Sequence, residues 1–140
     1  MEFRFDITPL AHQSVRFTKA GIAYPDREYL KYKRKLLAMA KEQVKRHGYS
    51  IANAPVSVSI RFYYEPLKSW SKKKQKAVSA EPIPKTTRPD IDNLQKPFLD
   101  AFNHYLWHDD SCIYRLEASK EHYHSTCIVM NLEETNERQD

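Results

Sequence analysis

The sequence predicts a single α+β domain, with a mixed β-sheet of about four strands and two α-helices in the order β-α-β-loop-α-β-β. The chain has 140 residues, 41% of them hydrophobic, so it can bury one core without a metal or disulfide staple. Four stretches alternate apolar and polar residues as strands do, and two others repeat apolar residues at helical spacing. We expect residues 1–132 to form the domain and residues 133–140 to be a polar tail that frays.

The alternating stretches predict strands at residues 2–7, 56–64, 112–118 and 125–132. The second of these is the clearest, because Pro55 marks its start and five apolar residues then occupy alternate positions: Val56, Val58, Ile60, Phe62 and Tyr64. Each of the four strands is therefore expected to turn one face toward the core.

The first helix is predicted from about residue 26 to 47, because Asp26 can cap its start and Gly48 can end it. Its apolar residues recur at helical spacing: Leu30, Leu36, Leu37, Ala40 and Val44. Its basic residues, which we interpret as a solvated face rather than a DNA contact, are Lys31, Lys35, Lys41, Lys45 and Arg46.

A second helix is predicted from about residue 93 to 106, with Leu94, Phe98, Ala101, Phe102 and Tyr105 on its apolar face. Pro97 lies too late for a first-turn proline, so we expect the start of this helix to be irregular. A polar segment, residues 65–89, separates it from the preceding strand, and a short basic helix is expected within it at about residues 71–80.

The composition excludes several classes of protein. With only 2 glycines, the chain has no phosphate loop and no dinucleotide-binding fold, so we expect no nucleotide cofactor. Its 2 cysteines form no C-x-x-C pair, which suits a reducing cytosol. No apolar run is long enough for a membrane span, and the N-terminal residues lack the apolar core of a signal peptide. We expect a soluble cytoplasmic protein with no membrane partner.

Charge is distributed unevenly along the chain, whose net charge is +5. Residues 1–89 hold 19 lysines and arginines against 7 acidic residues, a net charge of +12, whereas residues 90–140 hold 4 against 11, a net charge of −7. The basic half indicates a polyanionic partner such as nucleic acid. The acidic half would repel that partner unless a cation neutralised it.

Five aspartates lie within residues 90–110, namely Asp90, Asp92, Asp100, Asp109 and Asp110. Asp90 and Asp92 point to the same side of an extended backbone, and the Asp109–Asp110 pair precedes a predicted strand. If carboxylates of the two pairs meet, they demand a cation, and Mg²⁺ suits a few hard oxygen ligands. Such an ion activates water and offsets the negative charge that a phosphodiester gains in its transition state.

Each of these residues also has an ordinary structural interpretation. Asp92 can be a helix N-cap, with Gln95 completing a capping box. Asp100 and Lys96 stand four residues apart on the predicted helix and can form a surface ion pair.

Three motifs together resemble the RusA family of Holliday junction resolvases, which occurs in phages and prophages. They are Arg88-Pro89-Asp90-Ile91-Asp92-Asn93-Leu94-Gln95-Lys96, then Asp100-Ala101-Phe102-Asn103, then Trp107-His108-Asp109-Asp110-Ser111. Two upstream segments extend the resemblance over nearly the whole chain: the basic run Lys68-Ser69-Trp70-Ser71-Lys72-Lys73-Lys74, and Val15-Arg16-Phe17 with Tyr24-Pro25.

The resemblance implies a RusA-like fold and a Mg²⁺-dependent homodimeric endonuclease that makes paired symmetrical nicks in four-way DNA junctions during recombination and repair. The resemblance also implies that Mn²⁺ can substitute for Mg²⁺. Carried over by position, the metal ligands are Asp90, Asp92 and Asp110, and the catalytic lysine is Lys96. Two residues depart from the family pattern. Pro97 stands where members usually have a residue that favours a helix, and His104 stands where many members have a glycine. A phage or prophage gene acting in the cytoplasm of a bacterial host is implied.

The roles deduced from residue chemistry agree with this assignment. Lys96 carries a compact charge that can orient the attacking water or stabilise the phosphate in the transition state. A homodimer provides one site for each of the two strands that are cut. Candidate phosphate contacts are Arg16, Lys19, Lys72, Lys73, Lys74 and Arg88.

Other functions remain open at this level. The Asp-x-Asp pair occurs in transferases that bind a metal–nucleotide. A zinc site is conceivable among the histidines and cysteines of the second half, which are His104, His108, Cys112, His122, His124 and Cys127, although the usual ligand spacing is absent. The chain is alternatively a non-catalytic basic DNA-binding module, or a related nuclease that cuts flaps or forks.

Overall fold

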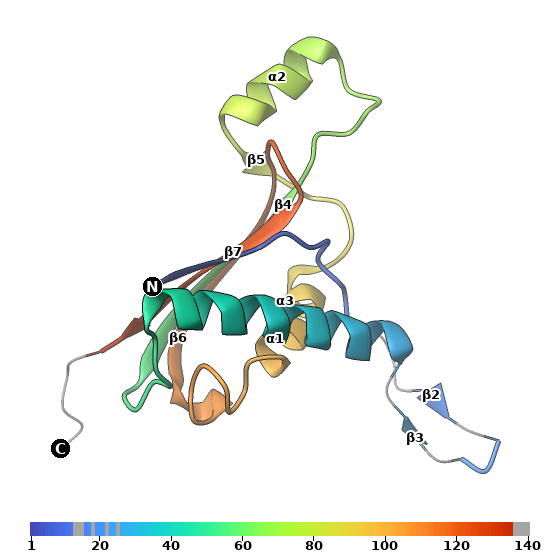
Figure 1. Cartoon of the computed structure of the whole chain (residues 1–140). Coiled ribbons are helices and arrows are strands. Elements are labelled where there is room, and N and C mark those ends of the chain that lie inside the picture. Colours follow the sequence, from blue (N-terminus) through green and yellow to red (C-terminus); the bar gives the residue numbers. More distant parts are fainter. Residues whose placement is uncertain (13–15, 18, 22, 25, 136–140) are drawn as a thin grey trace.

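The fold was obtained as a computed structural model, which describes residues 1–12, 16–17, 19–21, 23–24 and 26–135. It is a single α+β domain built on a mixed sheet, as predicted. The main sheet has five strands in the order β1-β7-β4-β6-β5, and three α-helices accompany it (Figure 1). The prediction of about four strands and two helices omitted β5 (Ile83–Pro84), which has two residues, and did not count the short helix α2 (Lys72–Ala80).

The four longer strands of the main sheet are β1 (Glu2–Phe5), β4 (Val56–Tyr64), β6 (Ile113–His122) and β7 (Cys127–Glu134). All neighbouring strands are antiparallel except β4 and β6, which run parallel. A parallel pair needs a long crossover connection, and here the crossover consists of α2, β5 and helix α3 (Ile91–Asp100). This crossover contains the Asp-x-Asp motif and most of the basic segment.

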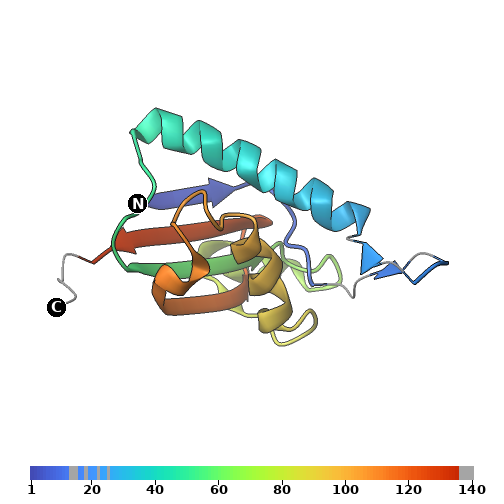
Figure 2. The same cartoon turned by 90° about the horizontal axis from the view of Figure 1, so that it is seen from below.

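Helices α1 (Arg27–His47) and α3 pack on the same face of the sheet, with the core between them and the strands (Figure 2). The core is rich in aromatic side chains, and Phe98 and Phe102 contact Phe5 across it with ring centroids 5.5 and 5.3 Å apart. Phe98 also meets Phe62 of β4, so α3 is fixed against both an edge strand and the centre of the sheet. This packing sets the position of the motif at the start of α3.

Helix α1 spans the predicted range, but its buried face differs from the prediction. Leu30 is 36% exposed, whereas Tyr32 and Gln43 are buried together with Leu36 and Ala40. The Gln43 amide donates to the carbonyl of Arg4 and accepts from the Arg4 backbone N–H, both at 2.8 Å. Gln43 therefore takes the place of a neighbouring strand along β1, a role that a polar residue in an apolar pattern does not reveal.

Helix α3 begins and ends earlier than predicted. It starts after Asp90, which is its N-cap residue, and stops at Asp100, after which the chain turns from Ala101 to Trp107. Pro97 lies inside the helix and cannot donate to the carbonyl of Asn93 four residues before it. The backbone N–H of His12 donates to that carbonyl at 2.6 Å. The unusual proline thus allows the N-terminal segment to attach to α3.

The basic segment between β4 and β5 folds as a projecting arm, residues 66–82, which we call the basic arm. Ser71 caps α2 by accepting a hydrogen bond from the Lys74 backbone N–H at 3.2 Å, which confirms the expected short basic helix. The Trp70 ring packs edge-on against buried His122 of β6, with centroids 4.7 Å apart, and Lys74 Nζ lies 3.9 Å above the Trp70 ring. These contacts attach the arm to the end of the sheet, beyond which it extends (Figure 1).

A second, smaller sheet pairs β2 (Arg16–Phe17) with β3 (Ala23–Tyr24). The boundaries of the last two predicted strands, residues 112–118 and 125–132, were wrong, because β6 runs from Ile113 to His122 and β7 from Cys127 to Glu134. Cys112 belongs to the 3₁₀-helix η1 (Asp110–Cys112) rather than to a strand core, and Glu133 and Glu134 are the last residues of β7 rather than part of a tail. None of the helices in the described ranges has the length and apolar character needed to cross a bilayer.

Candidate active site and DNA-binding surface

Asp90, Asp92 and Lys96 lie together at the start of α3. Asp90 is the N-cap residue but its side chain makes no cap hydrogen bond, and Asp92 is in the first turn. Lys96 follows Asp92 by four residues, so both side chains leave the same face of the helix. All three are exposed, and none has a hydrogen-bond or ion-pair partner among the described residues. Two free carboxylates and one free ammonium group therefore face solvent at this end of the helix.

The loop before α3 is held by Lys120 of β6. Its Nζ donates to the carbonyl oxygens of Thr87 and Pro89, at 2.5 and 2.8 Å. Lys85, in the same loop, donates to Thr87 Oγ1 at 2.7 Å, and burial together with the charge of Lys120 lowers the pKa of Lys85. The backbone immediately before Asp90 is thus fixed to the far end of β6.

Asp110 occupies a different environment, at the other end of β6. The Nε1 of Trp107, a fully buried residue that packs against Phe102, donates to Asp110 Oδ1 at 2.8 Å. The neighbouring Asp109 is exposed and accepts from the Ser111 backbone N–H at 3.0 Å, and hydrogen bonds from Ser111 lower the pKa of Asp109. The core therefore orients Asp110, whereas Asp109 serves as the cap of η1.

One chain does not bring the three predicted metal ligands together. Asp110 lies just before Ile113, and Asp90 follows the loop bound to Lys120, seven residues further along β6. An extended strand rises about 3.3 Å per residue, which separates the two ends by about 23 Å. The described residues contain no group of three or more His, Cys, Asp or Glu side chains able to hold a metal ion. The carboxylate oxygens of these three residues suit Mg²⁺ chemically, but in this structure of a single chain they are too far apart to bind one ion.

The local alternatives for the acidic residues are also decided. Asp92 is not the N-cap of α3, because Asp90 occupies that position. Lys96 and Asp100 form no ion pair in the part of the chain that the structure describes. Both interpretations that would have given these residues purely structural roles were therefore wrong.

The zinc alternative is not supported either, since all of its proposed ligands are described and form no metal group. The His104 ring contacts the carbonyl of His108, at 2.5 Å from Nδ1, and the His108 ring contacts Asn53. His122 Nδ1 lies 3.1 Å from the carbonyl of Glu65. His104 has a φ of 66°, a conformation that favours glycine, which gives a physical reason for the glycine expected at this turn.

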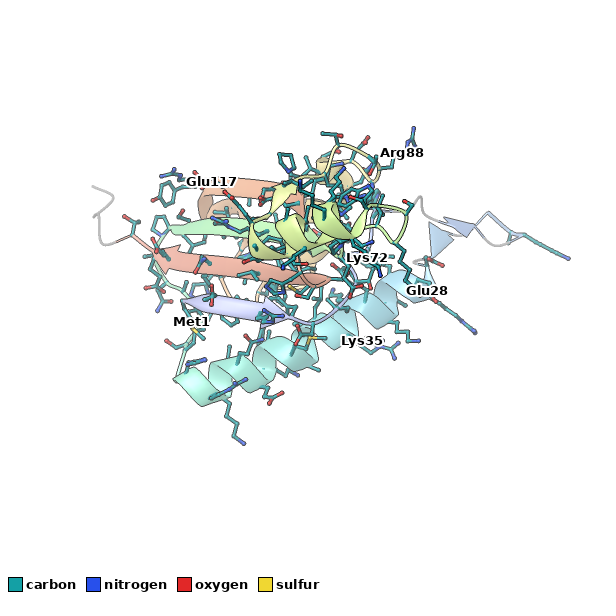
Figure 3. The ribbon with its side chains drawn as sticks, turned by 90° about the horizontal axis from the view of Figure 1, so that it is seen from above. Met1, Glu28, Lys35, Lys72, Arg88 and Glu117 are labelled. Atoms are coloured by element: carbon teal, nitrogen blue, oxygen red, sulfur yellow. The ribbon has the colours of Figure 1, made fainter. Side chains whose placement is uncertain are left out.

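Exposed basic side chains occur in three segments outside α3. Lys72, Lys73 and Lys74 are exposed on α2, and Arg88 is exposed in the loop before α3. Figure 3 shows Lys72 and Arg88 toward the same end of the molecule, opposite Met1. The small β2–β3 sheet projects elsewhere, beyond the start of α1 (Figure 1). It contains Arg16, whose backbone is described, and exposed Lys19 follows β2.

Comparison with known proteins identifies the family of the chain. The family model described as Endodeoxyribonuclease RusA matches residues 6–133. The chain belongs to the RusA family. It is also 34% identical over 109 residues to "Uncharacterized protein YqaN" of Bacillus subtilis (strain 168), a match that covers 76% of this chain and 74% of that protein. RusA proteins are Holliday junction resolving endonucleases, so this chain is an endodeoxyribonuclease that acts on branched DNA.

Two residues that hold the candidate site residues in place were missed in the sequence. Lys120 was not singled out, although it falls at an inward-facing position of an alternating strand, in register with buried Phe62 of β4. Trp107 was noted only as part of a motif, although a buried tryptophan needs a partner for its N–H group and Asp110 is three residues away. A polar group at a core position was the available signal in both cases.

Proposed function

We propose that this RusA protein is a Mg²⁺-dependent homodimer that resolves four-way DNA junctions by paired symmetrical nicks. Asp90, Asp92 and Asp110 are proposed as the metal ligands, with Mn²⁺ able to replace Mg²⁺, and Lys96 as a catalytic residue. The observation that best supports this is the pair of unpartnered carboxylates at the start of α3, with Asp92 on the same helix face as Lys96 and exposed Arg88 in the loop just before them.

Each group has a role that follows from its chemistry. When bound, the divalent cation would supply charge neutralisation and an activated water. Lys96 would bind a non-bridging phosphate oxygen or orient the attacking water, because its ammonium group is compact, exposed and without a partner. Asp90 and Asp92 lie at the N-terminal end of α3, the end of a helix where acidic side chains are favourably placed.

The basic arm, Arg88 and the β2–β3 region would bind the phosphates of the junction arms. Exposed lysines on a projecting helix can reach a backbone without reading its sequence, which suits recognition of DNA shape. Trp70, beneath Lys74, gives the arm a fixed base from which to present these charges.

A synthetic four-way junction tests the proposal. Wild-type protein with Mg²⁺ should give symmetrically nicked duplexes, and Asp90→Asn should lower cleavage by about a hundredfold or more while junction binding in a gel shift persists. Asp100→Asn, on the same helix, is the matched control and should cleave as wild type does. Undiminished cleavage by Asp90→Asn would overturn the assignment. A gel shift without products from wild type would favour a DNA-binding module, and faster cutting of flaps or forks would favour the related nuclease.

A further inference from the structure

We propose that Lys85 and Lys120 form a binding site for a DNA phosphate, namely the phosphate next to the scissile phosphodiester on the strand that is cut. The site lies in the loop that leads into Asp90. The inference rests on the proposed function, because it names the substrate group that would bring the scissile bond to the start of α3. It is supported by two half-buried ammonium groups that lie close together and have no acidic partner among the described residues.

Lys85 and Lys120 meet at a single residue, Thr87. The Lys85 Nζ donates to Thr87 Oγ1 at 2.7 Å, and the Lys120 Nζ donates to the Thr87 carbonyl at 2.5 Å. Their backbones are also joined, since the Lys85 N–H donates to the Lys120 carbonyl at 3.0 Å. Neither lysine forms an ion pair with a carboxylate in the ranges that the structure describes. Those ranges therefore supply no negative group to balance the two positive charges.

This arrangement is unfavourable in the absence of an anion. Burial, and then the charge of Lys120, lower the pKa of Lys85, so the charged form of Lys85 is disfavoured. The Tyr64 ring centroid lies 5.0 Å from Lys85 Nζ, but an aromatic face attracts an ammonium group less strongly than an ionised oxygen does. A phosphate oxygen that contacts both ammonium groups would offset their repulsion. The pair is therefore suited to bind an anion.

Holding the loop accounts for Lys120 but not for Lys85. Lys120 alone binds the two carbonyls of the loop, those of Thr87 and Pro89. The ammonium group of Lys85 contacts a hydroxyl and an aromatic ring, and it binds no carbonyl in the described part of the chain. A neutral glutamine can donate to the Thr87 hydroxyl as well. The positive charge at position 85 is thus not needed to hold the loop.

The position of this site suits the strand that is cut. The loop carries exposed Arg88, and Asp90 follows two residues later. Figure 1 shows this segment running from the base of the basic arm, past the end of the sheet, to the start of α3. A phosphate bound to Lys85 and Lys120 would therefore come beside the carboxylates. Lysine binds phosphate as a point charge and does not read the bases, which suits an enzyme that recognises DNA shape.

Neutral substitutions in the DNA backbone test the contact directly. A four-way junction is made with a methylphosphonate, which lacks the phosphate charge, at each position near the junction centre in turn. Binding is measured without divalent metal, so that no strand is cut. For wild type, one position should weaken binding by roughly tenfold, as expected for the loss of a hydrogen bond to a charged group. Lys85→Gln should bind the unmodified junction about as weakly and should lose nothing further at that position.

Two further variants separate the charge of Lys85 from the structure of the loop. Lys85→Arg keeps the charge and should retain the wild-type sensitivity to that methylphosphonate. Lys41→Gln removes a charge from the exposed face of α1 and should retain the sensitivity as well. A Lys85→Gln protein that responds to every methylphosphonate as wild type does would overturn the inference.

The salt dependence of binding gives a second measure. Lys85→Gln should lower the slope of log affinity against log salt by about 1, because one phosphate contact is lost. Lys41→Gln should leave the slope unchanged, since Lys41 is expected to touch no DNA. An unchanged slope in Lys85→Gln would contradict the phosphate contact.

These outcomes distinguish the inference from the proposed function. If wild type cuts the junction with Mg²⁺ but Lys85→Gln keeps the wild-type sensitivity to every methylphosphonate, the phosphate site is wrong and the proposed function stands. If wild type does not cut but Lys85→Gln has lost its sensitivity at one position, the proposed function is wrong. The phosphate site then stands as part of a DNA-binding surface.

Discussion

The start of α3 and the η1 turn both present aspartate to the proposed reaction, but they hold it differently. Asp90 and Asp92 are exposed and have no partner among the described residues, whereas Asp110 is bound to the indole of a fully buried tryptophan. The first region has two exposed carboxylates and an exposed lysine, and the second has one carboxylate that the core orients. The side chains at the start of α3 can therefore change orientation, whereas the Asp110 side chain is held by its hydrogen bond to Trp107.

The two regions also differ in how they are attached to the fold. The loop before α3 depends on Lys120, and α3 itself accepts the N-terminal segment at the carbonyl that Pro97 leaves free. The η1 region depends on Trp107, Phe102 and Tyr49, whose hydroxyl donates to the Leu106 carbonyl at 2.7 Å. The polar contacts that hold the two regions are therefore separate, although both regions pack on the same core through the Phe98–Phe102 contact.

The largest effect is expected within the Asp109–Asp110 pair. Asp110→Asn should reduce junction cleavage by about a hundredfold or more, as Asp90→Asn does, because a neutral amide is a poorer ligand for a hard cation. Asp109→Asn should cleave within a few-fold of wild type, since Asp109 caps η1. Single-turnover rates on a saturating junction would measure both. A larger loss for Asp109→Asn would show that the ligand is the other member of the pair.

Trp107→Phe should have the next largest effect. It removes the indole N–H that orients Asp110 and keeps an aromatic ring in the core, so cleavage should fall by about 10–100-fold, as for other groups that position a metal ligand. Junction affinity should not change, because no basic residue is altered. Phe102→Leu is the packing control: if it lowers cleavage as much as Trp107→Phe does at equal stability, packing rather than the hydrogen bond explains the loss.

The basic arm should contribute affinity rather than rate. Replacing Lys72, Lys73 and Lys74 with alanine should weaken junction binding and reduce the slope of log affinity against log salt by up to about 3. Replacing the exposed Lys41, Lys45 and Arg46 of α1 removes the same charge and should leave the slope nearly unchanged. Fluorescence anisotropy between low and moderate salt would measure both slopes. Equal slopes for the two triple variants would argue against the arm.

The smallest effect is a pH dependence at the η1 end. Burial raises the pKa of Tyr49 to about 12, above the value of about 10 expected when unfolded, so Tyr49 stabilises the fold below pH 10 and loses this contribution as the pH rises toward 12. Tyr49→Phe should flatten the fall in the free energy of unfolding above pH 10, as measured by urea unfolding. Tyr64→Phe should flatten it comparably, because burial raises the pKa of Tyr64 to about 12 as well. An unchanged slope would contradict this role.

Periodicity predicted the elements well wherever one face is buried along a whole strand or helix. Val56 to Tyr64 form β4 as expected because every second side chain enters the core. The second helix was predicted to continue to residue 106 because Ala101 and Phe102 maintain the apolar spacing, but they enter the same core from turns. Apolar spacing records burial, and turn residues that are buried can imitate a helix.

The candidate site shows a different limit. The residue types and their motifs could be recognised in the sequence, but the distance between Asp90 and Asp110 depends on β6. This strand begins just after η1, and Lys120 near its other end contacts the loop before α3. The 20-residue spacing between Asp90 and Asp110 does not reveal that the two aspartates lie toward opposite ends of β6.

Mn²⁺ binding tests most directly the claim that Asp90, Asp92 and Asp110 share one divalent ion. In calorimetric titrations of the intact protein, Asp90→Asn, Asp92→Asn and Asp110→Asn should each weaken Mn²⁺ binding by about tenfold or more, while Asp100→Asn and Asp109→Asn bind as wild type does. Wild-type affinity in Asp110→Asn would contradict the account, because the ion would then be held at the start of α3 alone.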